Sequence, residues 1–187
     1  MKIDLGCGLN KKAGFKGADI LHMPGVDYII DLEIGLSFLK DDEVEMFHSS
    51  HFLEHIENLE KLMTEIHRTL RPEGICEIVV PHFSNPYYYS DHTHKRFFGL
   101  YSFDYFSNES DKRYKRKVPC YSNKAKFRVV KRRLVFKSPQ FPVLHVVRKY
   151  LIGRFFNISP WFQELYEAFF SNKIACNEIH FILKPIK

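Results

Sequence analysis

The chain has 187 residues, of which 45% are hydrophobic and 27% are charged, as in an ordinary globular protein. That length fits one domain with a substantial core. Its four cysteines are scattered without a Cys-x-x-Cys pair, which argues against a disulfide or zinc framework and favours a reduced, cytoplasmic protein. No apolar run reaches the roughly 18 residues of a membrane span, and we expect no signal peptide before the first strand.

The net charge of +6 is concentrated in one segment of the chain. Residues 111–133 contain eleven Lys or Arg residues and one acid. The rest of the chain is slightly acidic, with 17 basic and 21 acidic residues. The excess of positive charge is therefore a local property of that segment and not of the fold.

The first half of the chain alternates strand and helix patterns. Short apolar segments predict four strands, at residues 1–6, 17–21, 26–31 and 44–50. Residues 58–70 predict a helix, because apolar residues recur at helical spacing after Asn58, a good N-cap, and residues 71–74 should end it in a turn. The continuous apolar run 75–80 is typical of a buried parallel strand. This alternation predicts an α/β domain that binds ligands at the carboxyl ends of its strands.

The second half is less regular. Residues 84–115 are rich in Tyr, Phe, Ser, His and Asp without a sustained period, and we interpret them as an irregular, functional insertion. Two further strands are predicted at 127–136 and 179–183, with helical pieces around 142–156 and 160–171. We expect residues 1–187 to form a single domain.

The first strand runs directly into a turn, Gly6-Cys7-Gly8. Because glycine has no Cβ, such a turn can adopt positive φ and lets a ligand approach the bare backbone. Asp19, at the end of the next apolar segment, is placed to accept hydrogen bonds from ribose hydroxyls. The third glycine of a dinucleotide fingerprint is replaced by Lys11, which disfavours a nicotinamide dehydrogenase. The pattern predicts some other nucleoside-containing cofactor.

Four more motifs follow this turn in order, and together they carry a family resemblance. The series is Asp4-Leu5-Gly6-Cys7-Gly8, Gly14 to Ile20, Asp31-Leu32, Ser50-His51-Phe52-Leu53-Glu54-His55-Ile56, and Leu70-Arg71-Pro72-Glu73-Gly74. It resembles the class I S-adenosylmethionine-dependent methyltransferases over roughly residues 1–83. The nearest likeness is to the type 11 branch, which includes predicted enzymes of cell-surface polysaccharide biosynthesis. The resemblance implies a Rossmann-like sheet, mostly parallel, with an antiparallel last strand.

The resemblance also implies which residues hold S-adenosylmethionine. The glycine turn would lie under its methionine part, with Asp4 near the amino group. Asp19 and the neighbouring Ile20 would lie at the ribose. The remaining implied contacts are Asp31 and the Leu32 amide at the adenine, and the Ser49 and Ser50 carbonyls at the amino group. An alternative for Asp4 and Asp31 is that each carboxylate only caps nearby amides.

Two features depart from the family pattern. Similar enzymes carry helices before the first strand, whereas this strand begins at Met1, so we expect those N-terminal helices to be missing. Eight residues separate Gly8 from Gly17, too few for an ordinary parallel crossover, so the first connecting helix should be a single turn or absent. The cofactor site would be open on that side unless residues 84–115 or another subunit close it.

Methyl transfer to a hydroxyl needs a base as well as alignment, and histidine suits that role near neutral pH. The candidates are His51, after the fourth strand, and His94 with Asp91 in the insertion. His55 lies in a recurring family segment, where we expect it to fix local structure. His92 and His94, with Asp91 and His82, are spaced poorly for metal binding, so we expect no metal site.

The basic segment and the apolar stretch 143–152 each leave three interpretations open. The basic segment is a solvated surface, a site for an anionic acceptor such as a nucleotide sugar or lipid phosphate, or an RNA-binding surface. The stretch 143–152 packs in the core, packs in a homodimer, or lies on an anionic membrane. Core packing is the default expectation for it.

We therefore predict a methyltransferase that uses S-adenosylmethionine on a small-molecule or glycan acceptor, at oxygen. That acceptor could be anionic or lipid-linked, with the protein cytoplasmic or peripheral at a membrane. The alternatives are an RNA methyltransferase, and a non-catalytic S-adenosylmethionine-binding scaffold that uses residues 111–133 to hold a partner.

Overall fold

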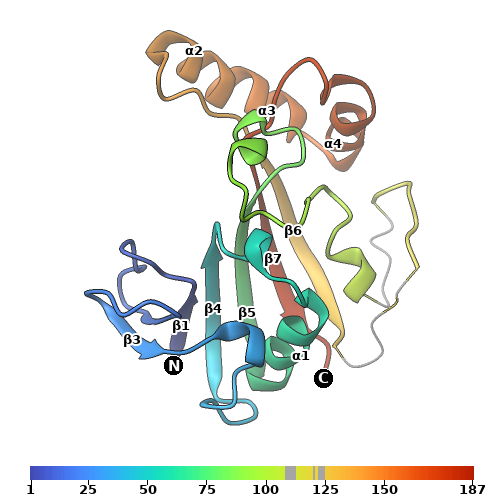
Figure 1. Ribbon diagram of the computed structural model, residues 1–187. Coiled ribbons are helices and arrows are strands. Elements are labelled where there is room, and N and C mark those ends of the chain that lie inside the picture. Colours follow the sequence, from blue (N-terminus) through green and yellow to red (C-terminus); the bar gives the residue numbers. More distant parts are fainter. Residues whose placement is uncertain (108–112, 120, 122–124) are drawn as a thin grey trace.

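The computed structural model describes residues 1–107, 113–119, 121 and 125–187. Its centre is a seven-stranded sheet with the order β3-β2-β1-β4-β5-β7-β6 (Figure 1). The strands are β1 (Lys2–Leu5), β2 (Lys16–Asp19), β3 (Val26–Ile29), β4 (Val44–Ser50), β5 (Leu70–Pro81), β6 (Phe127–Val135) and β7 (Glu178–Pro185). Neighbours from β3 to β5 pair in parallel, and β7 runs antiparallel to both β5 and β6. The predicted mixed Rossmann-like sheet is confirmed.

The helical elements of the described chain are short. They are α1 (Leu59–Thr69), α2 (Pro142–Val146), α3 (Gly153–Phe156) and α4 (Pro160–Leu165), the 3-10 turns η1 (Leu32–Ile34), η2 (Leu53–His55), η3 (Pro86–Ser90) and η4 (Asp104–Phe106), and the π-helical turns η5 (Val147–Ile152) and η6 (Tyr166–Phe170). None of those helices has the length and apolar character needed to cross a membrane.

Helix α1 forms where the sequence pattern places it. The Asn58 side chain accepts a hydrogen bond from the Lys61 amide at 3.0 Å, and Leu62, Met63 and Ile66 are buried against the sheet. The predicted turn after the helix is wrong in detail, because β5 already begins at Leu70. Leu70 pairs with Val44, and the next residue of β5 that pairs with β4 is Ile75. Residues 71–74 therefore form a bulge-like irregularity within β5, although their sequence is typical of a turn that ends a helix.

The sheet has one covered face and one open face. Along β5, Cys76, Ile78 and Val80 are buried, whereas the alternating Glu77 and Val79 remain partly exposed. The covered face packs against α1 and the aromatic residues of the insertion, including Phe98 and Phe103. The open face carries a cavity of about 310 Å³.

The open face follows from the short connections near the start of the chain. Between β1 and β2, residues 6–15 form turns without a helix, which confirms the expected loss of the first connecting helix. Residues 20–25, between β2 and β3, also contain no helix. The described chain therefore has no helix in these two connections to lie across the sheet on that side.

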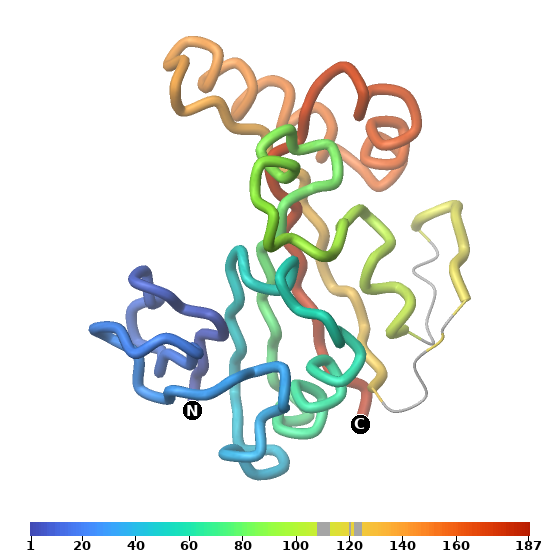
Figure 2. The backbone as a smooth tube through the Cα atoms, viewed as in Figure 1, coloured from blue at the N-terminus to red at the C-terminus, as the bar shows by residue number. Residues whose placement is uncertain are grey.

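The second half of the chain builds a lobe beyond the end of the sheet. Helices α2, α3 and α4 gather at the end that lies away from both termini (Figures 1 and 2). This end is where β4 and β5 finish, so it is the carboxyl end of the parallel strands. The described part of the insertion contains the short turns η3 and η4 and is otherwise irregular, as predicted for residues 84–115; residues 108–112 lie outside the described chain.

Candidate cofactor and acceptor site

The glycine turn after β1 is held in one shape by its surroundings. Gly6 and Gly8 have positive φ angles of 62° and 49°. The Gly6 amide donates to the Ala18 carbonyl at 2.9 Å, which ties the turn to the end of β2. A Cβ on Gly6 would lie 2.2 Å from the Phe52 ring, whereas one on Gly8 would meet nothing within 4 Å. Glycine is therefore needed at position 6 for space as well as for conformation.

Two buried carboxylates brace this turn. Asp19 accepts hydrogen bonds from the amides of Gly8 at 2.9 Å and Leu21 at 3.0 Å. Asp4 accepts one from the Lys12 amide at 2.7 Å, and its other oxygen lies 2.7 Å from Nδ1 of His48. Burial, followed by the charges of Asp19 and Asp4, raises the pKa of the Cys7 thiol. The loop from Gly6 to Phe15 is thus fixed by acids at the ends of β1 and β2.

The other residues implied to contact the cofactor lie at the same end of the sheet. Asp31 accepts from the Glu33 amide at 2.9 Å and caps η1, as its alternative interpretation predicts. Leu32 beside it is buried, whereas Ile20 is exposed. Ser49 is buried and its Oγ has no hydrogen-bond partner among the described residues. An orphaned hydroxyl beside an open glycine turn fits a polar ligand that supplies the missing partner.

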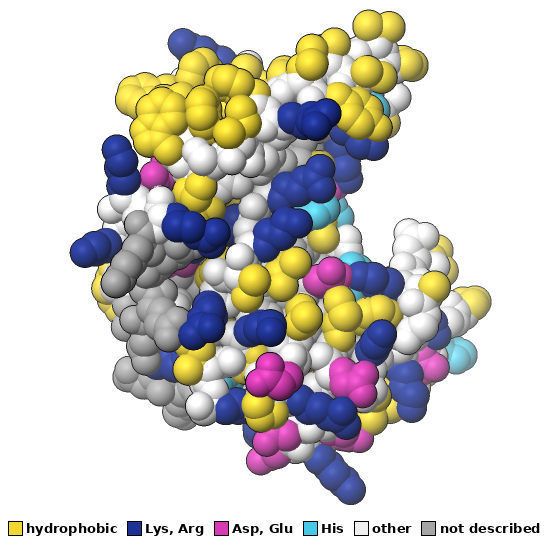
Figure 3. All heavy atoms as spheres, turned by 180° about the vertical axis from the view of Figure 1, so that it is seen from behind, with side chains coloured by type: hydrophobic (Ala, Val, Ile, Leu, Met, Phe, Trp, Pro, Cys, Tyr) yellow, Lys and Arg dark blue, Asp and Glu magenta, His cyan; other side chains and the backbone are white. Residues whose placement is uncertain are grey.

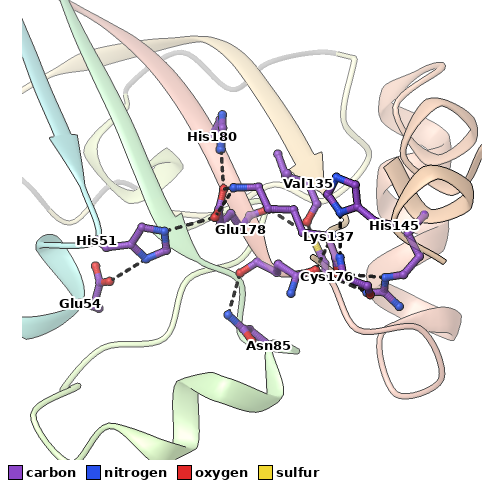
Figure 4. Close-up of polar contacts among 12 residues, drawn as sticks. His51, Glu54, Asn85, Val135, Lys137, His145, Cys176, Glu178 and His180 are labelled. Carbon is purple, nitrogen blue, oxygen red and sulfur yellow. Dashed lines mark hydrogen bonds and ion pairs between the residues drawn. The ribbon is translucent and has the colours of Figure 1, made fainter. Parts of the chain in front are cut away.

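His51 follows β4 in a conformation rare for a residue with a side chain, with φ of 54°. Its Nε2 lies 3.3 Å from Glu178 and its Nδ1 lies 3.4 Å from Glu54 (Figure 4). The contacts with the carboxylates of Glu178 and Glu54 raise the pKa of His51 to about 9. At neutral pH this imidazole is a cation, and it has no lone pair with which to act as a base.

Glu178, at the start of β7, connects His51 to the helical lobe. Its carboxylate accepts from Lys137 Nζ at 2.5 Å and 2.7 Å and lies 3.0 Å from His180 Nε2 (Figure 4). Burial acts to raise the pKa of Glu178, but the hydrogen bonds from His180, His51 and Lys137 outweigh it and lower that pKa. Sequence reasoning missed Glu178 because it lies 127 residues from His51 and in no motif.

The insertion folds back onto η2 and brings the second group of candidates together. The amides of Lys95 and Arg96 donate to the Glu54 carbonyl at 2.8 Å and 3.2 Å. The His94 ring therefore lies 4.8 Å from the His55 ring, measured between centroids. Asp91 Oδ2 lies 3.5 Å from His94 Nε2, and hydrogen bonds from Thr93 lower the pKa of Asp91.

Two other histidines from the sequence analysis lie apart from this group. His82 is fully buried and contacts Ser84 at 2.8 Å and Glu167 at 3.2 Å, beneath the helical lobe. His92 is exposed, in contrast to the half-buried His94. The structure therefore does not bring His82, Asp91, His92 and His94 together as one group.

The basic segment has several roles in the part that the structure describes. Arg132 is buried, pairs with Asp104 at 2.5 Å and lies 4.1 Å from the Tyr114 ring centroid, so it is structural. Lys131 and Arg133 instead line the cavity on the open face, together with Glu77. Among the described residues neither of those two cations has an ion-pair partner. Residues 111, 112, 120 and 122–124 of the segment lie outside the described chain.

The stretch 143–152 contradicts the default expectation of core packing. Val143 is 80% exposed and Leu151 is 66% exposed. The side that faces the body carries polar anchors instead: His145 accepts from the Ser138 amide at 3.2 Å, and Arg148 donates to the Lys137 carbonyl at 3.1 Å. Apolar spacing alone could not distinguish a helix whose apolar side faces inward from one whose apolar side faces solvent.

Comparison with known proteins agrees with this architecture. Residues 16–78 match the family model for a methyltransferase domain, Methyltransf_11. A SAM-dependent methyltransferase from Archaeoglobus fulgidus is 19% identical, with a TM-score of 0.54 over 98% of this chain and 85% of that one. The YcgJ protein from Bacillus subtilis is 12% identical, with a TM-score of 0.56 over 100% of this chain and 91% of that one. No curated protein matches the sequence.

The chain therefore has the fold of the class I S-adenosylmethionine-dependent methyltransferases, and the domain match and the fold together support a methyltransferase. S-adenosylmethionine is the expected cofactor. The narrower resemblance to enzymes of polysaccharide biosynthesis stays a prediction.

Proposed function

We propose that this protein transfers a methyl group from S-adenosylmethionine to a hydroxyl of a glycan or small-molecule acceptor, presented at a membrane surface. The proposal depends above all on the glycine turn that closes onto Asp19 at the carboxyl end of β1, within a methyltransferase fold. Ligands of open α/β sheets bind at this end of the strands.

The residues at this end suit the parts of the cofactor. Bare backbone at Gly8, where a Cβ would meet nothing within 4 Å, admits its methionine portion, and Asp4 and Asp19 supply negative charge beside that backbone. Each carboxylate oxygen that accepts one amide keeps a second lone pair for a ligand donor. Asp31, with the Leu32 amide and Ile20, lies where the adenosine would extend, and the chain around Ser49 and Ser50 closes the other side. When bound, S-adenosylmethionine supplies an electrophilic methyl group.

On the acceptor side we assign proton transfer to His94, supported by Asp91. His94 Nδ1 donates to the Tyr88 carbonyl at 2.9 Å, so in the neutral ring Nε2 carries the lone pair. A hydroxyl proton can move to this Nε2, and the carboxylate of Asp91 stabilises the resulting imidazolium. His51, a cation at neutral pH, contributes positive charge toward an anionic acceptor.

The helical lobe supports a membrane location for the acceptor. Phe155, Trp161 and Phe169 are also exposed, and hydrophobic side chains gather on this lobe in Figure 3. Residues 137–163 contain four basic residues and no acid. Aromatic and aliphatic side chains with nearby Lys and Arg are the composition of helices that bind anionic bilayers. A second copy of the chain would bring like charges together, so we assign the lobe to anionic lipid.

Vesicle flotation tests the location. Wild-type protein should float with vesicles that contain anionic lipid and not with neutral vesicles, and a Val143→Ser/Leu151→Ser double variant should stay in solution. The matched control is Ile29→Ser/Ile34→Ser, which changes two exposed residues far from the lobe. Flotation of the lobe variant as efficient as wild type, or a wild-type dimer that ignores vesicles, would contradict the membrane assignment.

Cofactor binding and acceptor class need separate measurements. Asp19→Ala should weaken S-adenosylhomocysteine binding about 10- to 100-fold by calorimetry, because hydrogen bonds to a charged group are lost. The control is Asp41→Ala, which removes an exposed acid that pairs with Arg68.

The acceptor class is tested with a labelled methyl donor. We expect incorporation of label into lipid-linked or soluble glycan extracts. Label in RNA would instead favour an RNA methyltransferase, and tight donor binding without turnover a scaffold.

A further inference from the structure

Three side chains of the metal-binding types converge beside the acceptor residues. One ligand atom from each of Glu54, His55 and His94 lies within 4.8 Å of the others. Glu54 and His55 come from η2, directly after β4, and His94 comes from the insertion. The backbone hydrogen bonds from Lys95 and Arg96 to Glu54 hold these two segments together.

The carboxylate of Glu54 is buried and has few partners for its charge. Glu54 is 0% exposed, and neither of its oxygens has a hydrogen-bond partner among the described residues. Its nearest cationic group is the His51 ring, whose Nδ1 lies 3.4 Å from Glu54 and whose Nε2 lies 3.3 Å from Glu178, so two carboxylates share that one charge. The hydroxyl of Tyr88, whose ring packs 4.6 Å from His94, is likewise buried without a partner. Buried carboxylates are stable when they are paired or coordinate a metal, and Glu54 shares the charge of His51 with Glu178, so its carboxylate can accept a second cation.

The hydrogen bonds of the two histidines show which ring nitrogen of each is free to bind a cation. The Thr93 hydroxyl donates its only proton to Asp91 at 2.6 Å, so its oxygen accepts from His55 Nδ1 at 2.9 Å. His94 Nδ1 donates in the same way to the Tyr88 carbonyl. Both neutral rings therefore keep a lone pair on Nε2. Histidines that bind metals commonly donate the other ring nitrogen to a carbonyl or another acceptor in this manner.

We propose that Glu54, His55 and His94 bind a divalent transition-metal ion, with Zn²⁺ the best match. Two histidines and one glutamate form a known catalytic zinc set that leaves a position open. Tetrahedral bonds of about 2.1 Å separate ligand atoms by about 3.4 Å, so binding requires the side chains to close slightly. Nitrogen ligands disfavour Mg²⁺, which prefers oxygen.

The consequence for catalysis rests on the proposed function, whereas ion binding does not. A hydroxyl that coordinates the open position loses its proton more readily than a free one. In the loaded protein His94 is then a ligand, and the proton passes to solvent or to Asp91 as the metal–oxygen bond strengthens. In the metal-free protein His94 remains the proton acceptor.

The first test is a Zn²⁺ titration of chelator-treated protein by calorimetry, without methyl donor. We expect one ion per chain, and at least about 10- to 100-fold weaker binding in Glu54→Gln and His94→Asn. His92→Asn removes an exposed histidine two positions from His94 and should bind like wild type. No saturable binding by wild type, or equal affinity in Glu54→Gln, would overturn the site.

The second test needs no substitution, so it holds even if a variant fails to fold. Co²⁺ added to the wild-type protein should give the visible absorption of a four- or five-coordinate ion, and the spectrum of the aqueous ion alone would overturn the proposal. Mg²⁺ should not compete with Co²⁺. If the wild-type protein binds Zn²⁺ but transfers no methyl group to any extract, the proposed function is contradicted and the metal site still stands.

Discussion

Gly6 and Gly8 share a left-handed backbone but differ in their surroundings. A side chain at either position adopts an unfavourable φ, which costs about 1–2 kcal/mol. Only at Gly6 does the new Cβ also overlap the Phe52 ring. We expect Gly8→Ala to lower the free energy of unfolding by about 1–2 kcal/mol and Gly6→Ala by about 2–5 kcal/mol. Chemical denaturation of the pair measures the difference, and equal losses would show that Phe52 moves aside freely.

His51 is the residue whose charge the structure changes most. Because Glu178 and Glu54 favour its protonated ring, its resonance should titrate near pH 9 in NMR spectra of the chelator-treated protein. In Glu178→Gln one of those carboxylates is neutral, so the pKa of His51 should fall. The control is Glu73→Gln, which makes the same charge change at the other end of β5. An unperturbed His51 pKa in wild type would restore this residue as a candidate base.

At the scale of elements, α1 is the clearest case of local sequence that specifies local structure. Its Asn58 side chain satisfies an amide in the first turn that the helix itself leaves free. We expect Asn58→Ala to lower the free energy of unfolding by about 1 kcal/mol. Asn172→Ala, at an exposed position outside the helices, is the control in the same thermal or urea titration. An Asn58→Ala loss no larger than the control would mean that packing of Leu62 and Ile66 alone fixes the helix start.

Elements whose apolar residues follow a helix or strand pattern could be predicted, because that pattern is present in the local sequence. The strands β4 and β6 and helix α1 have apolar residues at the spacing of their own geometry, and the structure places them as expected. The start of β5 could not be predicted, because residues 71–74 contain the turn formers Pro72 and Gly74, whereas Leu70 before them already pairs with Val44 of β4. Tertiary pairing there overrides local preference.

The cofactor end of the site could be predicted further than the acceptor end. Asp4, Gly6 and Asp19 are adjacent because parallel strands finish at one edge, which the strand pattern already implies. The strand pattern does not single out Glu54, because this residue meets His94 only when the insertion folds back onto η2. The ion pair between Glu178 and His51 depends on β7 lying beside β5, and a sequence pattern does not specify that neighbour.

At the scale of the whole molecule, the short connections near the start of the chain expose one part of the sheet, whereas the long second half adds structure at its end. The former leave one sheet face open, with Lys131 and Arg133 in its cavity. The latter add an apolar lobe at the carboxyl end of the strands, where the candidate site lies. If the lobe binds lipid as we propose, a lipid-binding surface and a cavity lined by cations both belong to this molecule, which suits an acceptor with both a lipid and an anionic portion.

This arrangement predicts how turnover should depend on the way an acceptor is presented. If the lobe docks on anionic bilayers, a lipid-linked acceptor in such vesicles is concentrated at the site, and its apparent KM should fall about 10-fold or more relative to the same acceptor in neutral vesicles. Val143→Ser/Leu151→Ser should abolish that difference and leave the affinity for S-adenosylhomocysteine unchanged, because neither residue lies near the glycine turn. The measurement is initial methyl-transfer rate against surface concentration of acceptor. An equal KM in both vesicle types for wild type would mean that the lobe has no part in delivering the acceptor.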